Sequence, residues 1–435
     1  MLEDLLSQAQ NLADQTEIFQ VTSRSTPVSF EANRLKSVDD RDSNGVALRI
    51  IKNGRIGFSS TTNMADMNGL VARAVEILPF GAKASMEFPP ASQYADIPTF
   101  DQATSDLKPE DIVETGSHII DKLHTEWPDV MWSASLSKTI ATTRLLNSSG
   151  CHAEETTSAI SIGVEGTLVK GTDMFFAWES QSTCHPTLDI PQIVCSIERK
   201  LYWAEDVAPA PTGSIPVIFT PSAVADLLLE PLLEGFNGTN IVQGSSPLIE
   251  KLTTQMLDPR ITLWDDPTIP YIPGSSAFDG EGVPCNRLPL IQKGVISNFI
   301  FDLQTAGQAG VRSTGNAHRG LGSQPTPGSS VLIIDPGETT FNEMIAGYST
   351  ALIVESFLGA GQGNTLGGDF SANVLLGYAV VNGKVTGRVK DTMVAGNVYN
   401  ILKNLDALGS ESEWVEGFLL TPALSCTRVS VSSKS

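Results

Sequence analysis

The sequence lacks a long apolar run. None of its apolar stretches approaches the roughly 18 residues that cross a bilayer. The first residues, MLEDLLSQAQNLADQ, carry acidic groups where a signal peptide carries basic ones, and Leu2, Leu5, Leu6, Ala9 and Leu12 share one face of a helix. We therefore expect a cytoplasmic protein without membrane contact, whose first helix docks on the rest of the chain.

Cysteine and histidine are scarce, with five of each in the chain. The cysteines form no Cys-x-x-Cys pair and are odd in number, which favours reduced thiols over disulfides. No two histidines are four residues apart, and the neighbours Cys151-His152 and Cys184-His185 would point to opposite faces of a strand. The sequence therefore predicts no metal and no other cofactor in this chain.

Positive charge is also in short supply. The chain has 28 Lys and Arg against 49 Asp and Glu, for a formal net charge of -21. Such a surface repels phosphate, so direct nucleic-acid binding is disfavoured. The sequence contains no P-loop and no Gly-x-Ser-x-Gly elbow, so neither of these catalytic signatures applies.

The length of the chain, 435 residues, predicts two domains, because it exceeds the usual size of a single hydrophobic core. The segment DVAPAPTGS at 206–214 is rich in proline, alanine and glycine and lacks apolar periodicity, so it is the expected linker. We predict an N-terminal domain at 1–205 and a C-terminal domain at 215–435.

The N-terminal domain is predicted to combine helices and strands. Strands are expected in FQVTSRSTPVSFEANRLKSV and in GVALRIIKNGRIGFSS, the latter with a hairpin turn at Asn53-Gly54, where both residues tolerate positive φ. Helical spacing of apolar residues marks 63–77, 108–127 and 189–202.

The C-terminal domain is predicted to be rich in β-structure. It opens with a strand at 215–219 and a helix at 222–236 that a Thr-Pro pair introduces. Turn signals follow at Asp279-Gly280, Lys293-Gly294 and Asn382-Gly383. The sequence thus predicts an α+β protein whose second domain is an antiparallel sheet or a partly closed barrel.

Two glycine-dense segments, 275–284 and 358–371, and the polar loop 312–319 are the candidate binding surfaces. Ordering so many glycines costs chain entropy, so they favour close backbone approach or positive φ, with plain β-turns as the alternative. Asp279 and Glu281 are further candidates for acid–base chemistry, although turn and hydrogen-bonding roles are favoured for them. The candidate groove residues are Phe278, Asp279, Gly280, Glu281, Gly282, Asn316, His318, Arg319, Gly367, Gly368 and Asp369.

At these segments the chain resembles the TldD/TldE family, also called the PmbA or gyrase-modulator family. The matching stretches run in family order and include FEANRLKSV, GVALRI, NGRIGFSS, LLNSSG, FDGEGVP, STGNAHRG and GGDFSANVLLGYAVVNGKV. The likeness covers most of the chain, from about residue 17 to 400.

The resemblance implies a dimer in which a TldD-type and a TldE-type subunit enclose a protease chamber. TldD-type chains carry His-Glu-x-x-x-His on a helix and a late cysteine as zinc ligands. Here the matching helix has Leu229, Glu230 and Glu234 at the motif positions, and Leu408 stands where that pattern has cysteine. Zinc catalysis needs about three protein ligands, so the resemblance implies a TldE-like chain without the zinc motif. Pro231 is expected to kink this helix.

Three functions follow as hypotheses. The first is a non-catalytic subunit that pairs with a zinc-bearing TldD-type partner and admits unfolded or small peptides. The second is a self-sufficient hydrolase that uses carboxylates such as those of Glu230, Glu234, Asp279 and Glu281, with or without a metal ion other than zinc. The third is a homodimeric peptide-binding or regulatory protein, whose acidic charge favours protein contacts over DNA.

Overall fold

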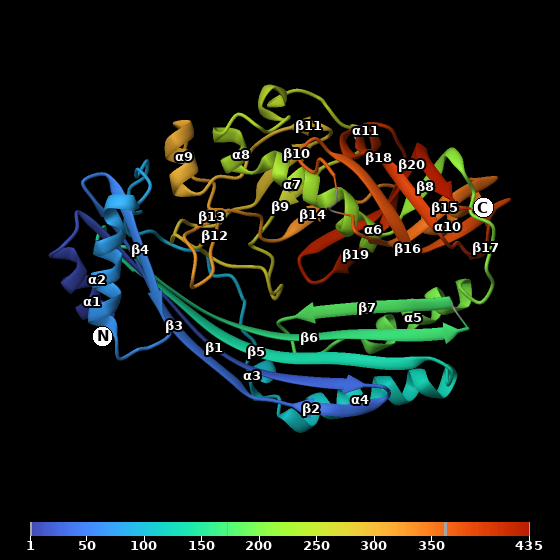
Figure 1. Ribbon diagram of the computed structural model, residues 1–435, viewed down its shortest axis with the longest axis horizontal. Helices are drawn as coiled ribbons and strands as arrows, with labels where there is room; N and C mark the ends of the chain where they lie inside the picture. Colours follow the sequence, from blue (N-terminus) through green and yellow to red (C-terminus); the bar gives the residue numbers. More distant parts are fainter. Residues whose placement is uncertain (1, 172, 361–362, 435) are drawn as a thin grey trace.

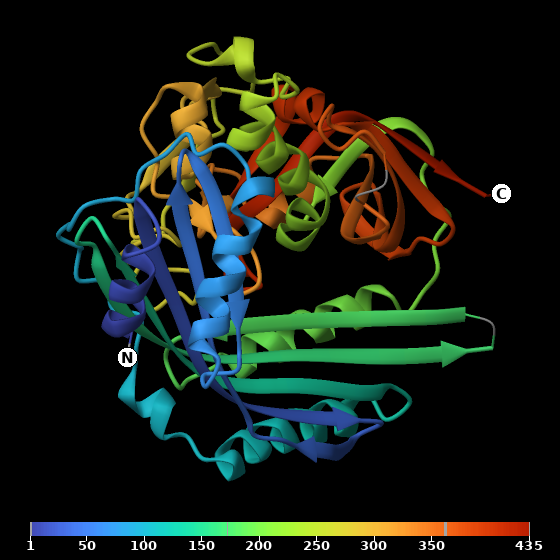
Figure 2. The same ribbon diagram turned by 60° about the vertical axis from the view of Figure 1, so that its left-hand side comes forward.

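The computed structural model describes residues 2–171, 173–360 and 363–434. Figure 1 shows two parts: a long twisted sheet built from the first half of the chain, and a β-rich body built from the second half that lies along one side of this sheet. Figure 2 shows the same two parts from another side, with the strands of the first sheet running beneath the second part.

The first sheet is antiparallel throughout. Within the described residues it has seven strands in the order β4-β3-β1-β5-β6-β7, with β2 paired to β1. β6 has 19 residues, so at about 3.3 Å per residue it extends over roughly 60 Å. The strands are β1 (Gln15–Glu31), β2 (Arg34–Val38), β3 (Arg41–Lys52), β4 (Arg55–Thr61), β5 (Met131–Asn147), β6 (His152–Lys170) and β7 (Asp173–Thr183).

The predicted hairpin turn at Asn53-Gly54 is confirmed. These residues have φ of 50° and 70° and join β3 to β4, as a turn of two left-handed residues does. The turns Lys293-Gly294 and Asn382-Gly383 are confirmed in the same way, with positive φ at all four positions.

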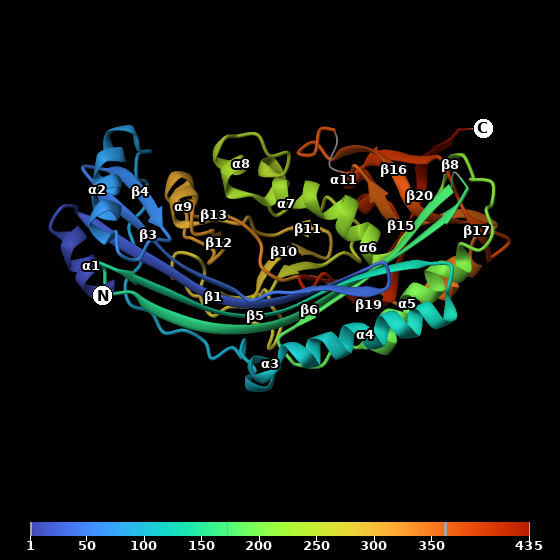
Figure 3. The ribbon, with the colours of Figure 1, turned by 60° about the horizontal axis from the view of Figure 1, so that its bottom comes forward.

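The helices of the N-terminal domain confirm the predicted ones with small shifts. α4 (Pro109–Glu126) and α5 (Ile190–Trp203) lie along one face of the first sheet, towards one end of its strands. α1 (Leu2–Gln10) and α2 (Met67–Ile77) lie at the opposite end (Figure 3). α2 begins four residues later than expected, because the Asp66 side chain caps it. Short turns follow at η1 (Leu78–Phe80) and α3 (Gln102–Asp106).

The prediction that Leu12 lies on the buried face of the first helix is wrong. Leu2, Leu5 and Ala9 are buried as expected, but Leu12 is 43% exposed. The helix ends at Gln10, so the helical spacing on which the prediction rested does not extend to Leu12.

The C-terminal domain contains a closed ring of five strands. β8 (Gly213–Phe219), β15 (Thr350–Leu358), β16 (Asp369–Val381), β18 (Thr392–Asn397) and β20 (Leu419–Ser433) pair in this order, and β20 pairs back to β8. Buried side chains such as Phe219, Leu352 and Val394 form its core. The predicted α+β class and the β-rich, barrel-containing second domain are therefore confirmed.

The remaining elements extend from this barrel. β14, β9, β10 and β11 continue the sheet from β20 in that order. The bounds are α8 (Gly238–Val242), η3 (Ile249–Lys251), β9 (Leu263–Asp265), β10 (Leu288–Gln292), β11 (Val295–Ile296), α9 (Leu303–Ala309), β12 (Ala317–His318), β13 (Thr326–Pro327), β14 (Leu332–Ile334), α10 (Phe341–Ala346), β17 (Lys384–Arg388), α11 (Val398–Lys403) and β19 (Leu405–Val415).

Helix α5 joins the two parts. One apolar core combines side chains of α4, α5 and the first sheet with Ile218, Ile353 and Tyr378 of the barrel. The Tyr378 hydroxyl donates a hydrogen bond to the carbonyl of Lys200 at 3.1 Å. The segment 206–214 leads from α5 to β8, and a domain boundary within it stays a prediction.

Membrane contact was not expected from the sequence. Among the helices of the described residues, none combines the length and the apolar character that a membrane span requires.

The barrel core can be tested by truncating Phe219, which is fully buried. We expect Phe219→Ala to lower the free energy of unfolding by about 3–5 kcal/mol, because it removes a large apolar side chain and leaves a cavity. The matched control is Phe80→Ala, at a side chain that is 84% exposed, with an expected cost below about 0.5 kcal/mol. Urea denaturation measures both, and equal losses would contradict the assignment.

Candidate functional site

The helix predicted at 222–236 has an irregular course. It consists of α6 (Pro221–Ala223), a π-helical segment η2 (Val224–Leu229) and α7 (Glu230–Phe236). Pro231 has no N–H to donate to the preceding turn, and its ring crowds that turn, so a regular α-helix is disfavoured here. The distortion expected at Pro231 is therefore found as a wider turn just before it, where hydrogen bonds run over five residues.

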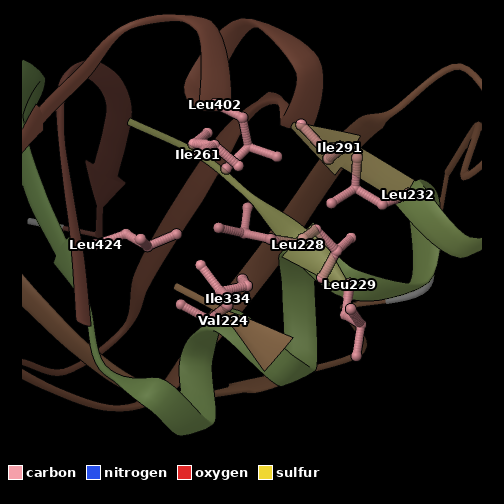
Figure 4. A pocket seen from close by; sticks show the side chains of 10 residues that line it. Val224, Leu228, Leu229, Leu232, Ile261, Ile291, Ile334, Leu402 and Leu424 are labelled. Atoms are coloured by element: carbon pink, nitrogen blue, oxygen red, sulfur yellow. The ribbon is translucent and has the colours of Figure 1, made fainter. Parts of the chain in front are cut away.

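Leucine side chains occupy the buried side of this helix. Leu229 lines a small cavity whose lining residues are all apolar and come from η2, α7, α11, the surrounding strands and the loop before β9 (Figure 4). Leu408 is buried in the same core, and its strand partner Leu424 lines the same cavity. Two of the positions singled out from the sequence thus belong to one hydrophobic core.

The two carboxylates of the helix face outward. Glu230 and Glu234 are exposed, and the Glu234 carboxylate accepts a hydrogen bond from the side-chain amide of Asn240 at 2.7 Å. These oxygens could contact a partner or a solvated ion, but they lie on the other side of the helix from the leucine core.

The second glycine-dense segment packs against this helix. The hydroxyl of Tyr399 donates to the carbonyl of Pro231 at 3.2 Å and approaches the carbonyl of Leu366 at 3.4 Å. Gly368 has a φ of 79°, and a Cβ there would lie 2.8 Å from the Tyr399 ring, so glycine is required by both conformation and space. Gly367 adjoins it, and the exposed Asp369 accepts a hydrogen bond from Asn397 at 2.8 Å. Residues 361 and 362 of the predicted segment lie outside the described residues.

The first glycine-dense segment lies elsewhere, at the junction of the two domains. Phe278, Asp279 and Glu281 are buried there. The Tyr94 hydroxyl donates to the carbonyl of Gly282 at 2.9 Å. Gly282 has a φ of 78°, and a Cβ on it would lie 2.7 Å from the Cys151 sulfur, so this glycine allows the close approach of the domains.

A chain of four buried charges crosses this junction. Arg49 donates to Glu281 at 2.7 Å and to Glu17 at 2.8 Å, and Arg319 donates to Glu17 at 2.6 Å. Each of these side chains is at most 2% exposed. Glu17 and Arg49 come from the first sheet, whereas Glu281 and Arg319 come from the C-terminal domain. Each domain supplies one acid and one base. The Arg49–Glu281 and Arg319–Glu17 pairs cross between the domains, whereas the Arg49–Glu17 pair lies within the first sheet.

Aromatic rings and backbone groups complete this network. The guanidinium of Arg49 lies 5.0 Å from the ring centre of Phe88, and that of Arg319 lies 4.3 Å from the ring centre of Phe19. The second oxygen of Glu281 accepts the N–H of Leu303 at 2.7 Å. Burial opposes the charged form of Arg49, but the two glutamates outweigh it and raise its pKa.

Asp279 adjoins the network as a hydrogen-bond acceptor. Its carboxylate accepts the backbone N–H groups of Glu281, Val283 and Ala317 at 2.9–3.0 Å. Burial, and then the charge of Glu281, raise the pKa of Asp279 to about 7, although the three N–H donors oppose this shift. Asp279 and Glu281 therefore have the hydrogen-bonding roles that the sequence favoured.

The polar loop contributes one buried and one exposed candidate. The Asn316 amide donates to the buried carboxylate of Asp265, whose pKa burial raises to about 6. His318 is exposed, and its ring lies 3.3 Å from the Ser330 hydroxyl.

The candidate residues thus divide into two groups. Those at the junction bind one another, and because their side chains are buried they do not line an open groove within this chain; Gly280 is half-buried there. Gly367, Gly368 and Asp369 lie instead beside α7. A groove role for the exposed members, such as His318 and Asp369, stays a prediction.

The partners of the junction residues were missed at the sequence level. Glu17 and Arg49 are charged residues within apolar strand segments, EIFQV and GVALRII. A charge in a buried strand needs a partner, so these two positions carried a signal of a buried ion pair. The sequence did not predict which residues are the partners, because Glu281 is 232 positions from Arg49.

Replacing Arg49 tests the network. We expect Arg49→Met to lower the free energy of unfolding by about 3–5 kcal/mol, because it leaves buried carboxylates without their cation. The control is Arg24→Met on the same sheet, where the pair with Asp42 is more than two-thirds exposed and worth less than about 1 kcal/mol. Denaturant unfolding measures both variants, and a mild effect of Arg49→Met would contradict the role of the network.

The raised pKa of Asp279 predicts a pH dependence. The folded state binds the Asp279 proton more tightly than the unfolded state, whose pKa is 3.8, so the stability from this group is full below pH 4 and is lost as pH rises towards 7. The side chain in Asp279→Asn does not titrate, so the stability of the variant lacks this pH dependence. The difference in free energy of unfolding between wild type and variant should therefore be larger at pH 5 than at pH 8, by about 1–3 kcal/mol. Unfolding at both pH values measures this, with Asp369→Asn as the exposed control.

Comparison with known proteins places this geometry in a family. A family model described as PmbA/TldA metallopeptidase C-terminal domain matches residues 212–433, and one described as PmbA/TldA metallopeptidase domain 1 matches residues 16–78. The chain is 24% identical over 431 residues to a metalloprotease from Methanothermobacter thermautotrophicus, which covers 96% of this chain and 92% of that protein. It is 29% identical over 205 residues to the metalloprotease TldD homolog of Haemophilus influenzae, covering 47% of this chain and 42% of that protein.

A solved structure has the same fold. The crystal structure of TldE from Thermococcus kodakarensis matches with a TM-score of 0.91 over 99% of each chain, at 23% sequence identity. Because the family models match the first strands and nearly the whole C-terminal domain, this chain belongs to the PmbA/TldD metallopeptidase family.

Proposed function

We propose that this chain is a TldE-like, non-catalytic subunit, which pairs with a TldD-type zinc subunit to process or degrade unfolded or small peptides. The observation that carries this proposal is the burial of Leu229 and Leu408 in one apolar core. In the TldD-type pattern these two positions hold a histidine and a cysteine.

The side chains at the motif positions do not fit zinc. Catalytic zinc in proteins takes about three nitrogen, sulfur or oxygen ligands with one open position for water. Here the donors are the exposed carboxylates of Glu230 and Glu234, one of which already accepts a hydrogen bond from Asn240. Among the residues that the structure describes, no group of three or more His, Cys, Asp or Glu side chains is arranged to hold a metal ion. We therefore propose that the partner subunit holds the zinc of the complex.

A role in holding peptides is supported by the position of the glycine-dense segment beside the motif helix. The Tyr399 hydroxyl contacts the carbonyls of Pro231 and Leu366, so this segment lies next to the motif helix. The net charge of -21 favours partners and substrates that are proteins or peptides over nucleic acid.

The alternative of a self-sufficient carboxylate hydrolase has less support. Asp279 and Glu281 are buried and bonded within the domain junction, whereas Glu230 and Glu234 are exposed on α7. A homodimeric peptide-binding protein remains the second candidate, because the exposed face of α7 could meet a second copy of this chain.

The proposal is tested by combining this chain with a TldD-type subunit. We expect co-purification as a heterodimer in size-exclusion chromatography, zinc at one ion per pair, and peptide cleavage that neither chain supports alone at the same rate. The variant Glu230→Gln/Glu234→Gln should leave cleavage by the pair within about twofold, because these carboxylates do not supply the catalytic base.

Three results would contradict the proposal. They are the absence of a complex, the presence of stoichiometric zinc in the isolated chain with chelator-sensitive cleavage, and a loss of cleavage of a hundredfold or more in the double glutamine variant. A homodimer that excludes the zinc subunit would favour the second candidate.

A further inference from the structure

A cleft of about 410 Å³, lined by a mixture of polar and apolar side chains, opens between the two domains. Its walls come from three elements: residues 179–181 of β7, one face of α5, and residues 412–414 of β19. A volume of this size suits a ligand as large as one or two amino-acid residues. Neither the motif helix nor the junction network contributes to its lining.

The charges in this cleft do not balance. Lys200 is paired with Glu179 at 3.0 Å, and Arg199 is paired with Glu355 at 3.4 Å. Glu413 brings a third carboxylate, for which neither a hydrogen bond nor an ion pair is found within the described residues. Glu179 and Arg199 in the lining thus have ionic partners, which leaves the carboxylate of Glu413 for a cation to neutralise.

Burial raises the pKa of Glu413, and the charge of Arg199 opposes this shift. The charges of Glu179 and Glu355 also raise the pKa of Glu413, whereas the charge of Lys200 lowers it. A cation placed beside Glu413 would therefore stabilise its charged form, as an opposite charge at close range does.

Two further groups in the lining are short of partners. Arg199 has five N–H donors, and its only hydrogen bond among the described residues is the long one to Glu355. Its side chain is 30% exposed, and the ring centres of Trp203 and Phe341 lie 5.4 and 5.8 Å from the guanidinium. The Ser412 hydroxyl is buried without a hydrogen-bond partner. The lining of the cleft therefore includes an anionic acceptor, a cationic donor and a hydroxyl.

We propose that this cleft binds the amino terminus of a peptide. The α-ammonium would pair with Glu413, the first carbonyl oxygen would accept from Arg199, and the first side chain would lie against Ile193 and Trp414. A lysine side chain meets only part of this arrangement, because no carbonyl adjoins its ammonium group. The choice of a peptide rests on the proposed function, whereas the preference for an ammonium group rests on the charges alone.

The test uses the isolated full-length chain and isothermal titration with alanyl-alanine amide. We expect saturable binding, at least tenfold weaker binding of N-acetyl-alanyl-alanine amide, which lacks the positive charge, and at least tenfold weaker binding to Glu413→Gln. The matched control is Glu416→Gln on the same hairpin, outside the cleft lining, with unchanged affinity. Thermal unfolding of both variants verifies that they are folded.

Several outcomes would overturn the proposal: no binding to the wild-type chain, equal binding of the acetylated peptide, or equal affinity of Glu413→Gln. Equal binding of Nα-acetyl-lysine amide would show that any amine is accepted, and full competition by ammonium chloride at equal concentration would show a simple cation site. Either result also contradicts recognition of an amino terminus. Because no zinc subunit is present in this assay, failure of the heterodimer leaves its outcome unaffected.

Discussion

The relative position of the two domains depends on the alternating chain of charges Glu281, Arg49, Glu17 and Arg319. A buried charge without a partner is costly, so each of these side chains requires the one next to it. Two of the three pairs, Arg49–Glu281 and Arg319–Glu17, cross between the first sheet and the C-terminal domain, so separating the domains would leave Glu281 and Arg319 unpaired. Gly282 allows this approach because a larger residue would collide with Cys151.

The functional surfaces follow from that arrangement. The motif helix and the glycine-dense residues 363–371 belong to the barrel domain, where the Tyr399 hydroxyl contacts both of them and a π-helical turn precedes Pro231. The cleft beside Glu413, in contrast, exists only because β7 and α5 of one domain meet β19 of the other. A chain whose motif positions form an apolar core can therefore still bind peptides through a cleft between its domains, as we propose.

Local signals predicted much of the fold. The hairpin at Asn53-Gly54 and the limits of α4 were readable because turn chemistry and helical periodicity act over a few residues. The same periodicity misplaced Leu12, since it does not mark where a helix ends. The junction network was beyond sequence reasoning, because nothing local pairs Arg49 with a glutamate 232 positions away.

By itself, the sequence determined the α+β class, the main elements, the family resemblance, and the presence of leucine and glutamate at the motif positions. These follow from periodicity, turn residues and residue identity, which are properties of short segments. Only the tertiary structure decided that Leu229 and Leu408 share one core, that Asp279 and Glu281 are bonded inside a domain junction, and that Glu413 is left unpaired in a cleft. Burial and charge pairing depend on which distant segments meet, and that is settled by packing of the whole chain.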